Sequence, residues 1–125
     1  MYQNSLDMAK AIADICYDKL AKDVIVLDLS QEQGMCECDY FVIADAPTRN
    51  QLNDIADSID RELSAQGIEP KSVQGRNDNT WTLMDYGLVI VHLFISGERK
   101  FYNLEGLWKS APLVYSPEPA QKLDE

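Results

Sequence analysis

The chain has 125 residues, of which 46% are hydrophobic and 26% are charged. This length fits one domain with its own core, and the longest apolar run, GLVIVHLFI at 87–95, is far too short to cross a bilayer. The net charge of −10 disfavours binding to nucleic acid and suits either a basic protein partner or simple solubility.

The N-terminal stretch MYQNSLDMAKAIADI has neither a secretory signal nor an arginine-rich transit peptide, so we expect a cytoplasmic protein of bacterial type. Three cysteines, Cys16, Cys36 and Cys38, cannot all pair, and two of them are one residue apart. This pattern favours a reducing compartment. Because His92 is the only histidine, we expect no structural zinc site.

The first expected element is an amphipathic helix whose first turn Ser5 can cap. Its apolar residues recur at intervals of three and four. They are Met8, Ala11, Ile12, Ile15, Cys16 and Leu20. The runs VIVLDL at 24–29 and DYFVIAD at 39–45 are rich in β-branched and aromatic residues, and they predict two buried strands.

A second helix is predicted by TRNQ at 48–51, a capping box in which Thr48 accepts from the first turn and Gln51 reaches back. Gly67 ends this helix. The polar loop GRNDNT at 75–80 then leads to a hairpin that turns at Gly87.

The turn SGERK at 96–100 comes next, and the segment FYNLEGLW at 101–108 is expected to be a strand that runs into a last helical turn. Prolines and a charged end follow from Pro112, which predicts a mobile tail.

This order of elements predicts one domain of the mixed α/β (α+β) class at residues 1–111 and a flexible tail at 112–125. We expect a mixed sheet of about five strands, with helices on at least one face. The strands on either side of the second helix should be parallel neighbours or near-neighbours, joined by a right-handed crossover.

The hairpin WTLMDYGLVIVHLF at 81–94 contains the chain's histidine together with a tryptophan, an aspartate and a tyrosine. Strand alternation gives it one face with aromatic residues and few charges, and an opposite face that points to the core. The first face, which we expect to be exposed, contains Trp81, Leu83, Asp85, Leu88, Ile90, His92 and Phe94. Such a face is typical of the centre of a protein interface. The alternative is that Trp81 covers the sheet and His92 is a satisfied, partly buried histidine.

The sequence contains no GxSxG, GxGxxG or GxxxxGK motif, so common nucleophile and phosphate sites are not expected. Asp28, Asp39 and Asp85 could converge at strand ends and hold magnesium, although aspartates in such places commonly cap turns. A residual nucleotide- or metal-dependent enzyme is therefore the alternative hypothesis.

Six segments, VIVLDL, DYFVIA, IAD, WTLMDYG, VIVHLF and RKFYNLEGLWKSAP, stand in an order and at a spacing that resemble the ribosomal silencing factor family (RsfS or Iojap). The resemblance covers about Asp23 to Pro112. It implies a nucleotidyltransferase-like fold without a catalytic site, metal or cofactor. It also implies binding to ribosomal protein L fourteen on the large subunit, which blocks subunit joining and represses translation when nutrients are limiting.

Carried over from the family motifs, the residues implied to bind the partner come from the hairpin and the closing segment. They are Trp81, Leu83, Asp85, Tyr86, His92, Phe94, Arg99, Tyr102, Glu105, Leu107 and Trp108. Trp81 is the expected aromatic anchor, and Asp85 and Glu105 are expected to meet basic side chains. Trp108 is equally suited to the core. A homodimer through the exposed hairpin face is a third hypothesis.

Overall fold

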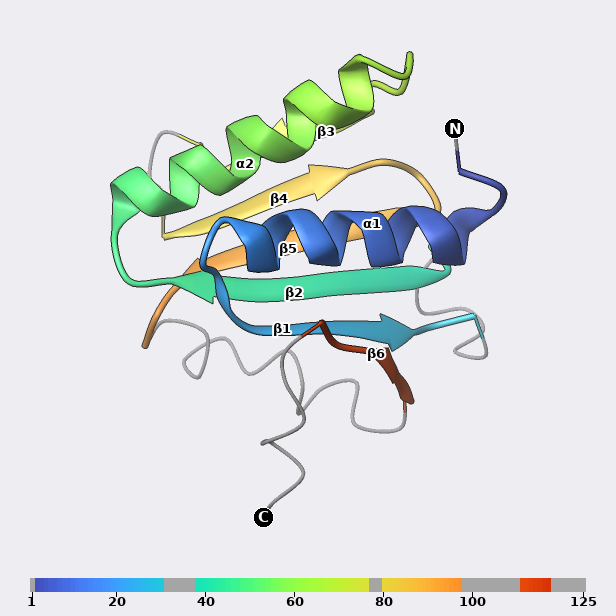
Figure 1. Cartoon of the computed structure of the whole chain (residues 1–125), viewed down its shortest axis with the longest axis horizontal. Coiled ribbons are helices and arrows are strands. Elements are labelled where there is room, and N and C mark those ends of the chain that lie inside the picture. Colours follow the sequence, from blue (N-terminus) through green and yellow to red (C-terminus); the bar gives the residue numbers. More distant parts are fainter. Residues whose placement is uncertain (1, 31–37, 77–79, 98–110, 118–125) are drawn as a thin grey trace.

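The computed structural model describes residues 2–30, 38–76, 80–97 and 111–117. Within these residues, two helices lie over one face of a sheet whose strand order is β3-β4-β5-β2-β1-β6 (Figure 1). The helices are α1 (Ser5–Asp18) and α2 (Arg49–Ser64), and the strands are β1 (Lys22–Asp28), β2 (Tyr40–Ala46), β3 (Ser72–Gln74), β4 (Trp81–Asp85), β5 (Val89–Ile95) and β6 (Leu113–Tyr115). The predicted mixed α+β class is confirmed. None of the described helices has the length and apolar character needed to span a membrane.

The sheet is mixed because β2 and β5 run parallel, whereas every other neighbouring pair is antiparallel. The prediction that the strand after the second helix runs parallel to β2 is wrong for β4. That strand is antiparallel to β5 and is separated from β2 by it. After α2 the chain first forms β4 and then turns back as β5. The parallel partner of β2 is therefore β5, the second strand of the hairpin.

Two short edge strands were not expected from the sequence. β3 pairs with β4 through Ser72–Gln74, all of which are exposed. β6 pairs with β1 through residues that the sequence assigns to the mobile tail. Both strands are only three residues long, and so short a segment has too little alternation to identify it. The predicted strand and helical turn at 101–108 lie outside the described residues.

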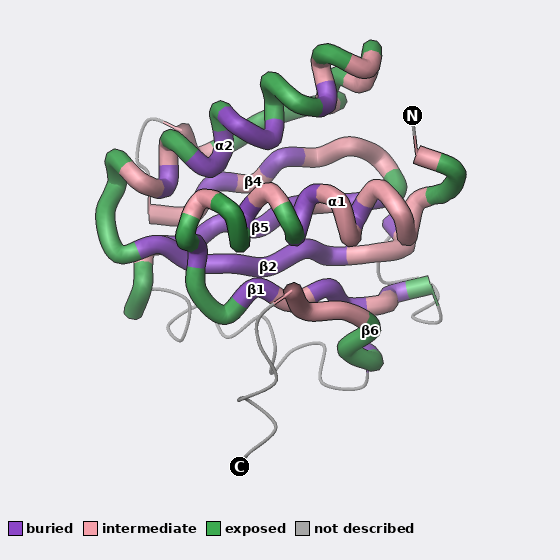
Figure 2. The backbone as a smooth tube through the Cα atoms, viewed as in Figure 1, coloured by how far each residue is buried: buried purple, intermediate pink, exposed green. Residues whose placement is uncertain are grey.

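The main core lies between the sheet and the two helices. The purple, buried parts of α1 and α2 face the central strands in Figure 2. The helices contribute Ile12, Ile55 and Ile59 to this cluster, among others, and the sheet contributes alternate residues such as Val42 and Val91. The predicted periodicities describe α2 and the strands on this face correctly. For α1 the prediction is right for Ile12 and Cys16 but wrong for Leu20, which follows the helix and is 74% exposed, and it left out the buried Ala9 and Ala13.

A second buried cluster covers the opposite face of the sheet. It is built from side chains that alternate with those of the main core: Leu27, Leu29, Cys38, Phe41, Ile43, Phe94 and Ala111. Phe94 is 0% exposed and His92 is 4% exposed. The expectation that this face of the hairpin is open to solvent is therefore wrong around these two residues.

Both helices begin close to the predicted positions. The cap of α1 is Asn4, one residue before the expected Ser5, and its side chain accepts from the Asp7 amide at 2.8 Å. Thr48 caps α2 as predicted, through a 3.1 Å bond from the Gln51 amide. The second half of the predicted capping box is wrong, because the Gln51 side chain donates to the carbonyls of Lys19 and Leu20.

The three cysteines have different environments. Cys16 is a free thiol in the main core, and burial raises its pKa to about 12, so it stays protonated and unreactive. Cys38 is disulfide-bonded, which differs from the reduced state inferred from the sequence. Cys36 lies outside the described residues.

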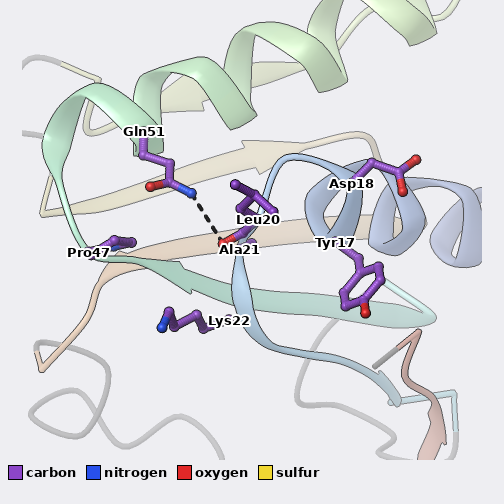
Figure 3. A pocket seen from close by; sticks show the side chains of 7 residues that line it. All are labelled: Tyr17, Asp18, Leu20, Ala21, Lys22, Pro47 and Gln51. Carbon is purple, nitrogen blue, oxygen red and sulfur yellow. Dashed lines mark hydrogen bonds between the residues drawn. The ribbon is translucent and has the colours of Figure 1, made fainter. Parts of the chain in front are cut away.

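The end of α1 is closed by an unusual residue. The Ala21 amide donates to Cys16 and the Leu20 amide to Tyr17, which is the Schellman pattern that normally has glycine in the left-handed position. Here that position is Leu20, with φ of 69° and a side chain 74% exposed. The side chain of Gln51, at the start of α2, holds the loop after α1 by donating to the Lys19 and Leu20 carbonyls. This loop borders a hollow of about 670 Å³ (Figure 3).

Replacing Leu20 with glycine should raise the free energy of unfolding by about 1 kcal/mol, because glycine adopts positive φ without steric cost. Urea denaturation measures this change. Leu20→Ala is the matched control, since it removes the same exposed side chain but keeps the Cβ atom, and it should not stabilise the protein. Equal stabilities of the two variants would contradict the proposed backbone strain.

Candidate partner-binding surface

The candidate surface is built on the β4–β5 hairpin, whose register is fixed by cross-strand pairs. Trp81 pairs with Phe94, Leu83 with His92, and Asp85 with Ile90. Directly paired residues of antiparallel strands share a face. The predicted assignment of these six side chains to one face of the hairpin is therefore confirmed.

At one end of this face, four aromatic rings form a connected cluster. The Trp81 indole Nε1 donates to His92 Nδ1 at 3.1 Å, and its ring stacks on Phe94 with centroids 5.2 Å apart. The Phe41 ring meets His92 edge-on, with centroids 4.4 Å apart. Trp81 is thus held in one orientation by a hydrogen bond and a ring contact, as a rigid anchor requires.

His92 is a neutral residue in this cluster. Burial lowers its pKa from 6.5 to about 4, because a charged imidazolium would lose its hydration. Since Nδ1 accepts from Trp81, the neutral ring carries its proton on Nε2. Nε2 is buried and has no hydrogen-bond partner within the described part of the chain. His92 is therefore a structural residue, and its hydrogen bond from Trp81 fixes the tautomer of the neutral ring.

The predicted site residues divide into three groups by accessibility. Trp81, Leu83, Asp85 and Tyr86 are half-buried and retain exposed surface. His92 and Phe94 are buried, so they support the surface from below. The remaining predicted residues lie outside the described residues: Arg99, Tyr102, Glu105, Leu107 and Trp108.

The turn that ends the surface is fixed by Asp85. One carboxylate oxygen, Oδ1, accepts from the Gly87 amide at 2.8 Å, and Gly87 has φ of 91°, a value that glycine tolerates best. The backbone carbonyl of Asp85 accepts from the Lys71 amide at 2.7 Å. Asp85 is therefore a turn-forming residue as well as a candidate contact for basic side chains.

The three aspartates of the magnesium hypothesis each serve local structure. Asp28 Oδ1 accepts from the backbone and hydroxyl of Ser30, at 2.9 and 2.6 Å. Asp39 Oδ2 accepts from the Ser5 hydroxyl at 3.2 Å, and Asp85 caps the turn at Gly87. Across the described ranges, no group of three histidine, cysteine, aspartate or glutamate residues is placed to hold a metal.

The sequence did not reveal a hollow of about 240 Å³ on the helix side of the same turn. It lies between the start of α1, Ile68 and the turn residues Tyr86 and Leu88. Strand alternation does predict that Tyr86 points away from Trp81. The closure of the hollow by α1 and by the segment after α2 depends on tertiary structure, which a local pattern does not contain.

Comparison with known proteins identifies the family. The family model described as "Ribosomal silencing factor during starvation" matches residues 2–125. The ribosomal silencing factor RsfS of Bacillus subtilis is 38% identical over 111 residues, covering 89% of this chain and 92% of its own. The chloroplastic protein Iojap of Arabidopsis thaliana is 32% identical and covers 90% of this chain, which spans 46% of that longer protein.

Two solved structures share the fold. A protein of Bacillus halodurans has a TM-score of 0.72 and 34% identity, with coverage of 90% of this chain and 98% of that one. A protein of Chromobacterium violaceum has a TM-score of 0.80 at 24% identity, with coverage of 98% and 100%. The named relatives are regulatory factors rather than enzymes, which overturns the enzyme hypothesis. The chain belongs to the ribosomal silencing factor family.

Proposed function

We propose that this protein represses translation when nutrients are limiting by binding ribosomal protein L fourteen on the large ribosomal subunit. Bound there, it hinders joining of the small subunit. The observation that carries this proposal is the family match over residues 2–125, together with relatives that are named as ribosomal silencing factors.

The surface chemistry suits a basic protein on a ribosome. A net charge of −10 steers the molecule toward cationic surfaces and resists nonspecific adhesion to the surrounding RNA. The field also predicts that association is faster at low ionic strength, because the Debye length is then longer. The net charge therefore speeds the association of the protein with its partner, and the hairpin makes the specific contacts.

The proposed contacts are the half-buried residues of the hairpin face. Trp81 is held by its bond to His92 and by its stacking on Phe94, so little side-chain entropy is lost when a partner covers it. Leu83 continues the apolar strip on the same face, and Asp85 ends it with a carboxylate. A central apolar strip with a polar rim is the usual layout of a protein interface.

Leu83→Ala should weaken binding to L fourteen about tenfold, or about 1.4 kcal/mol, because it removes a contact from the centre of the proposed surface. Titration calorimetry with L fourteen from the same cell measures the affinity. Leu113→Ala is the matched control, since Leu113 is 56% exposed on β6 at the other edge of the sheet. Equal loss in both variants would contradict the placement of the surface.

The effect on subunit joining needs a separate measurement. Purified large and small subunits are mixed with the protein, and sucrose-gradient sedimentation quantifies the fraction that associates. The proposal expects association to fall as the protein is added, and to recover with Leu83→Ala. If the protein binds the large subunit tightly but the association of the two subunits is unchanged, the proposed mechanism is contradicted and the proposed partner is not.

Self-association through the hairpin face is the competing use of this surface. Burial of His92 and Phe94 leaves the half-buried Trp81, Leu83 and Ile90 as the apolar residues of β4 and β5 on this face that could form such a contact, which is a small area for a stable dimer. Sedimentation velocity over a range of concentrations tests it. A dimer that is abolished by Leu83→Ala would show that copies of the chain compete with the ribosome for this face.

A further inference from the structure

The hollow beside the loop after α1 has exposed apolar side chains in its lining (Figure 3). Tyr17 and Leu20 come from the end of α1 and the loop after it, and Pro47 precedes the cap of α2. All three are exposed. The volume of about 670 Å³ is that of about 22 water molecules at about 30 Å³ each. Several residues of an extended segment therefore fit in the hollow.

Two charged side chains of opposite sign also line this hollow, and both are exposed. Asp18 is the last residue of α1, and Lys22 is the first residue of β1. Neither forms an ion pair with another described residue. A small ion of either sign would be attracted by one of them and repelled by the other. The lining therefore favours a segment that carries both signs around an apolar residue.

The described chain ends close to the same hollow. β6 runs antiparallel to β1 and therefore heads toward the start of β1. The Tyr115 hydroxyl donates to Asp14 at 2.6 Å, one helical turn before the residues of α1 that line the hollow. The Ser116 hydroxyl donates to the Val24 carbonyl at 2.7 Å. Pro117, the last described residue, thus follows two contacts that lie between the end of α1 and the start of β1.

The next eight residues, EPAQKLDE at 118–125, have the composition that the lining favours. Leu123 is their only large apolar residue, with Lys122 before it and Asp124 after it. The six residues from Pro117 to Leu123 span up to about 20 Å when extended, whereas one turn of an α-helix is about 5.4 Å long. The Leu123 side chain can therefore reach the hollow without tension in the chain.

We propose that residues 118–125 dock in this hollow as an intramolecular clip. The Leu123 side chain covers Tyr17 and Leu20, which removes exposed apolar surface from water. This contact explains why a leucine stands at φ of 69°, where glycine has no steric cost, because glycine would give Leu123 no side chain to cover. The clip differs from the mobile tail that the prolines predict, and it adds an attachment between the end of β6 and the end of α1.

The flanking charges set the direction of the docked segment. The chain arrives from the Asp14 side of α1, so Lys122 meets Asp18 first. Asp124, two residues further on, then meets Lys22. Exposed ion pairs of this kind add little affinity. A short linker, however, gives an effective concentration of about 1 mM or more, so a dissociation constant of about 1 mM keeps the clip closed for at least about half of the time.

NMR of the whole chain tests the contact directly. We expect nuclear Overhauser effects from the Leu123 methyl groups to the Tyr17 ring and to the Leu20 methyl groups. Leu123→Ala should shift the Leu20 methyl signals, whereas Gln121→Ala, the matched change in the same segment, should leave them in place. Absence of Overhauser effects from Leu123 to both residues, or equal shifts in the two variants, would overturn the proposal.

A peptide measures the affinity of the contact. A chain that ends at Pro117 retains every described element, and added peptide EPAQKLDE should move its Leu20 signals toward the wild-type positions, with a dissociation constant of about 1 mM. The control peptide EPAQKADE should bind at least about tenfold more weakly, because it lacks the leucine side chain. Equal binding of the two peptides would contradict the role of Leu123.

Reversal of the charges tests the direction of docking. Asp18→Lys and Lys122→Asp should each weaken the Overhauser effects between Leu123 and Leu20 about twofold, because each places like charges together. The double variant, which exchanges the two charges, should restore them. Weakening in both single variants with no recovery in the double variant would overturn the proposed direction.

A second copy of the chain is the competing occupant of the hollow. Isotope-filtered spectra of mixed labelled and unlabelled protein distinguish contacts within one chain from contacts between two chains. We expect the Leu123 contacts only within the labelled chain, and we expect them to be unchanged on dilution. Contacts between labelled and unlabelled copies would assign the hollow to a neighbouring chain and overturn the intramolecular clip.

Discussion

Phe94→Ala should lower the free energy of unfolding by about 3–5 kcal/mol, a large part of the ~5–15 kcal/mol that stabilises a typical domain. The Phe94 ring is 0% exposed and stacks on Trp81, so its removal leaves a cavity and frees the indole. Urea denaturation monitored by tryptophan fluorescence and by circular dichroism measures the change.

Tyr17→Ala is a suitable control for this experiment. Tyr17 is also aromatic, but it is 36% exposed at the end of α1, and its removal should cost less than about 1 kcal/mol. If Phe94→Ala were equally mild, the second cluster would not be a packed core. The hairpin face would then be free for a partner, as the sequence alone suggested.

Acidification should destabilise the protein through His92. Its pKa is about 4 in the folded protein and 6.5 in the unfolded chain, so the unfolded chain binds the proton more readily. The contribution of neutral His92 is therefore complete above pH 6.5, decreases as the pH falls below that value, and is lost near pH 4. The total loss is about 3 kcal/mol, at about 1.4 kcal/mol for each unit of pKa shift.

The measurement is the difference between wild type and His92→Asn in urea denaturation between pH 7 and pH 4. The asparagine carbonyl can still accept the Trp81 N–H but cannot titrate, so the variant retains only the acid sensitivity of the carboxylates. The two stability curves should converge as the pH falls. Parallel curves across this range would show that His92 is not protonated on unfolding.

Local features of the fold were predictable because the sequence encodes them at short range. The periodicity of α1 and α2, the Thr48 cap and the alternation in β4 and β5 are all properties of a few consecutive residues. The same alternation correctly placed Trp81 and His92 on one face. The aromatic contact between them follows directly from this register.

Features that depend on distant pairing were not predictable. The parallel partner of β2 is β5 rather than the next strand in the chain, and only the assembled sheet decides this. The burial of Phe94 was missed because a hydrophobic face reads the same in sequence whether a second layer or a partner covers it. The hollow at Tyr86 joins residues 2–8 with 68 and 86–88, positions that no local pattern relates.

The pairing of β1 with β6 makes the fold depend on the order of synthesis. β1 is completed early, but its outer edge gains a neighbour only when Leu113–Tyr115 has emerged. The Ser116 hydroxyl then donates to the Val24 carbonyl of β1 at 2.7 Å, and the Tyr115 hydroxyl donates to Asp14 of α1 at 2.6 Å. These two bonds attach the late segment to β1 and to α1.

Until then, the nascent protein presents an apolar strand with unpaired backbone groups, a template on which another chain can add. Leu113–Tyr115 therefore closes this edge to other copies of the chain only after it has emerged. A chain shortened before Leu113 would retain most of its core but would leave that edge open.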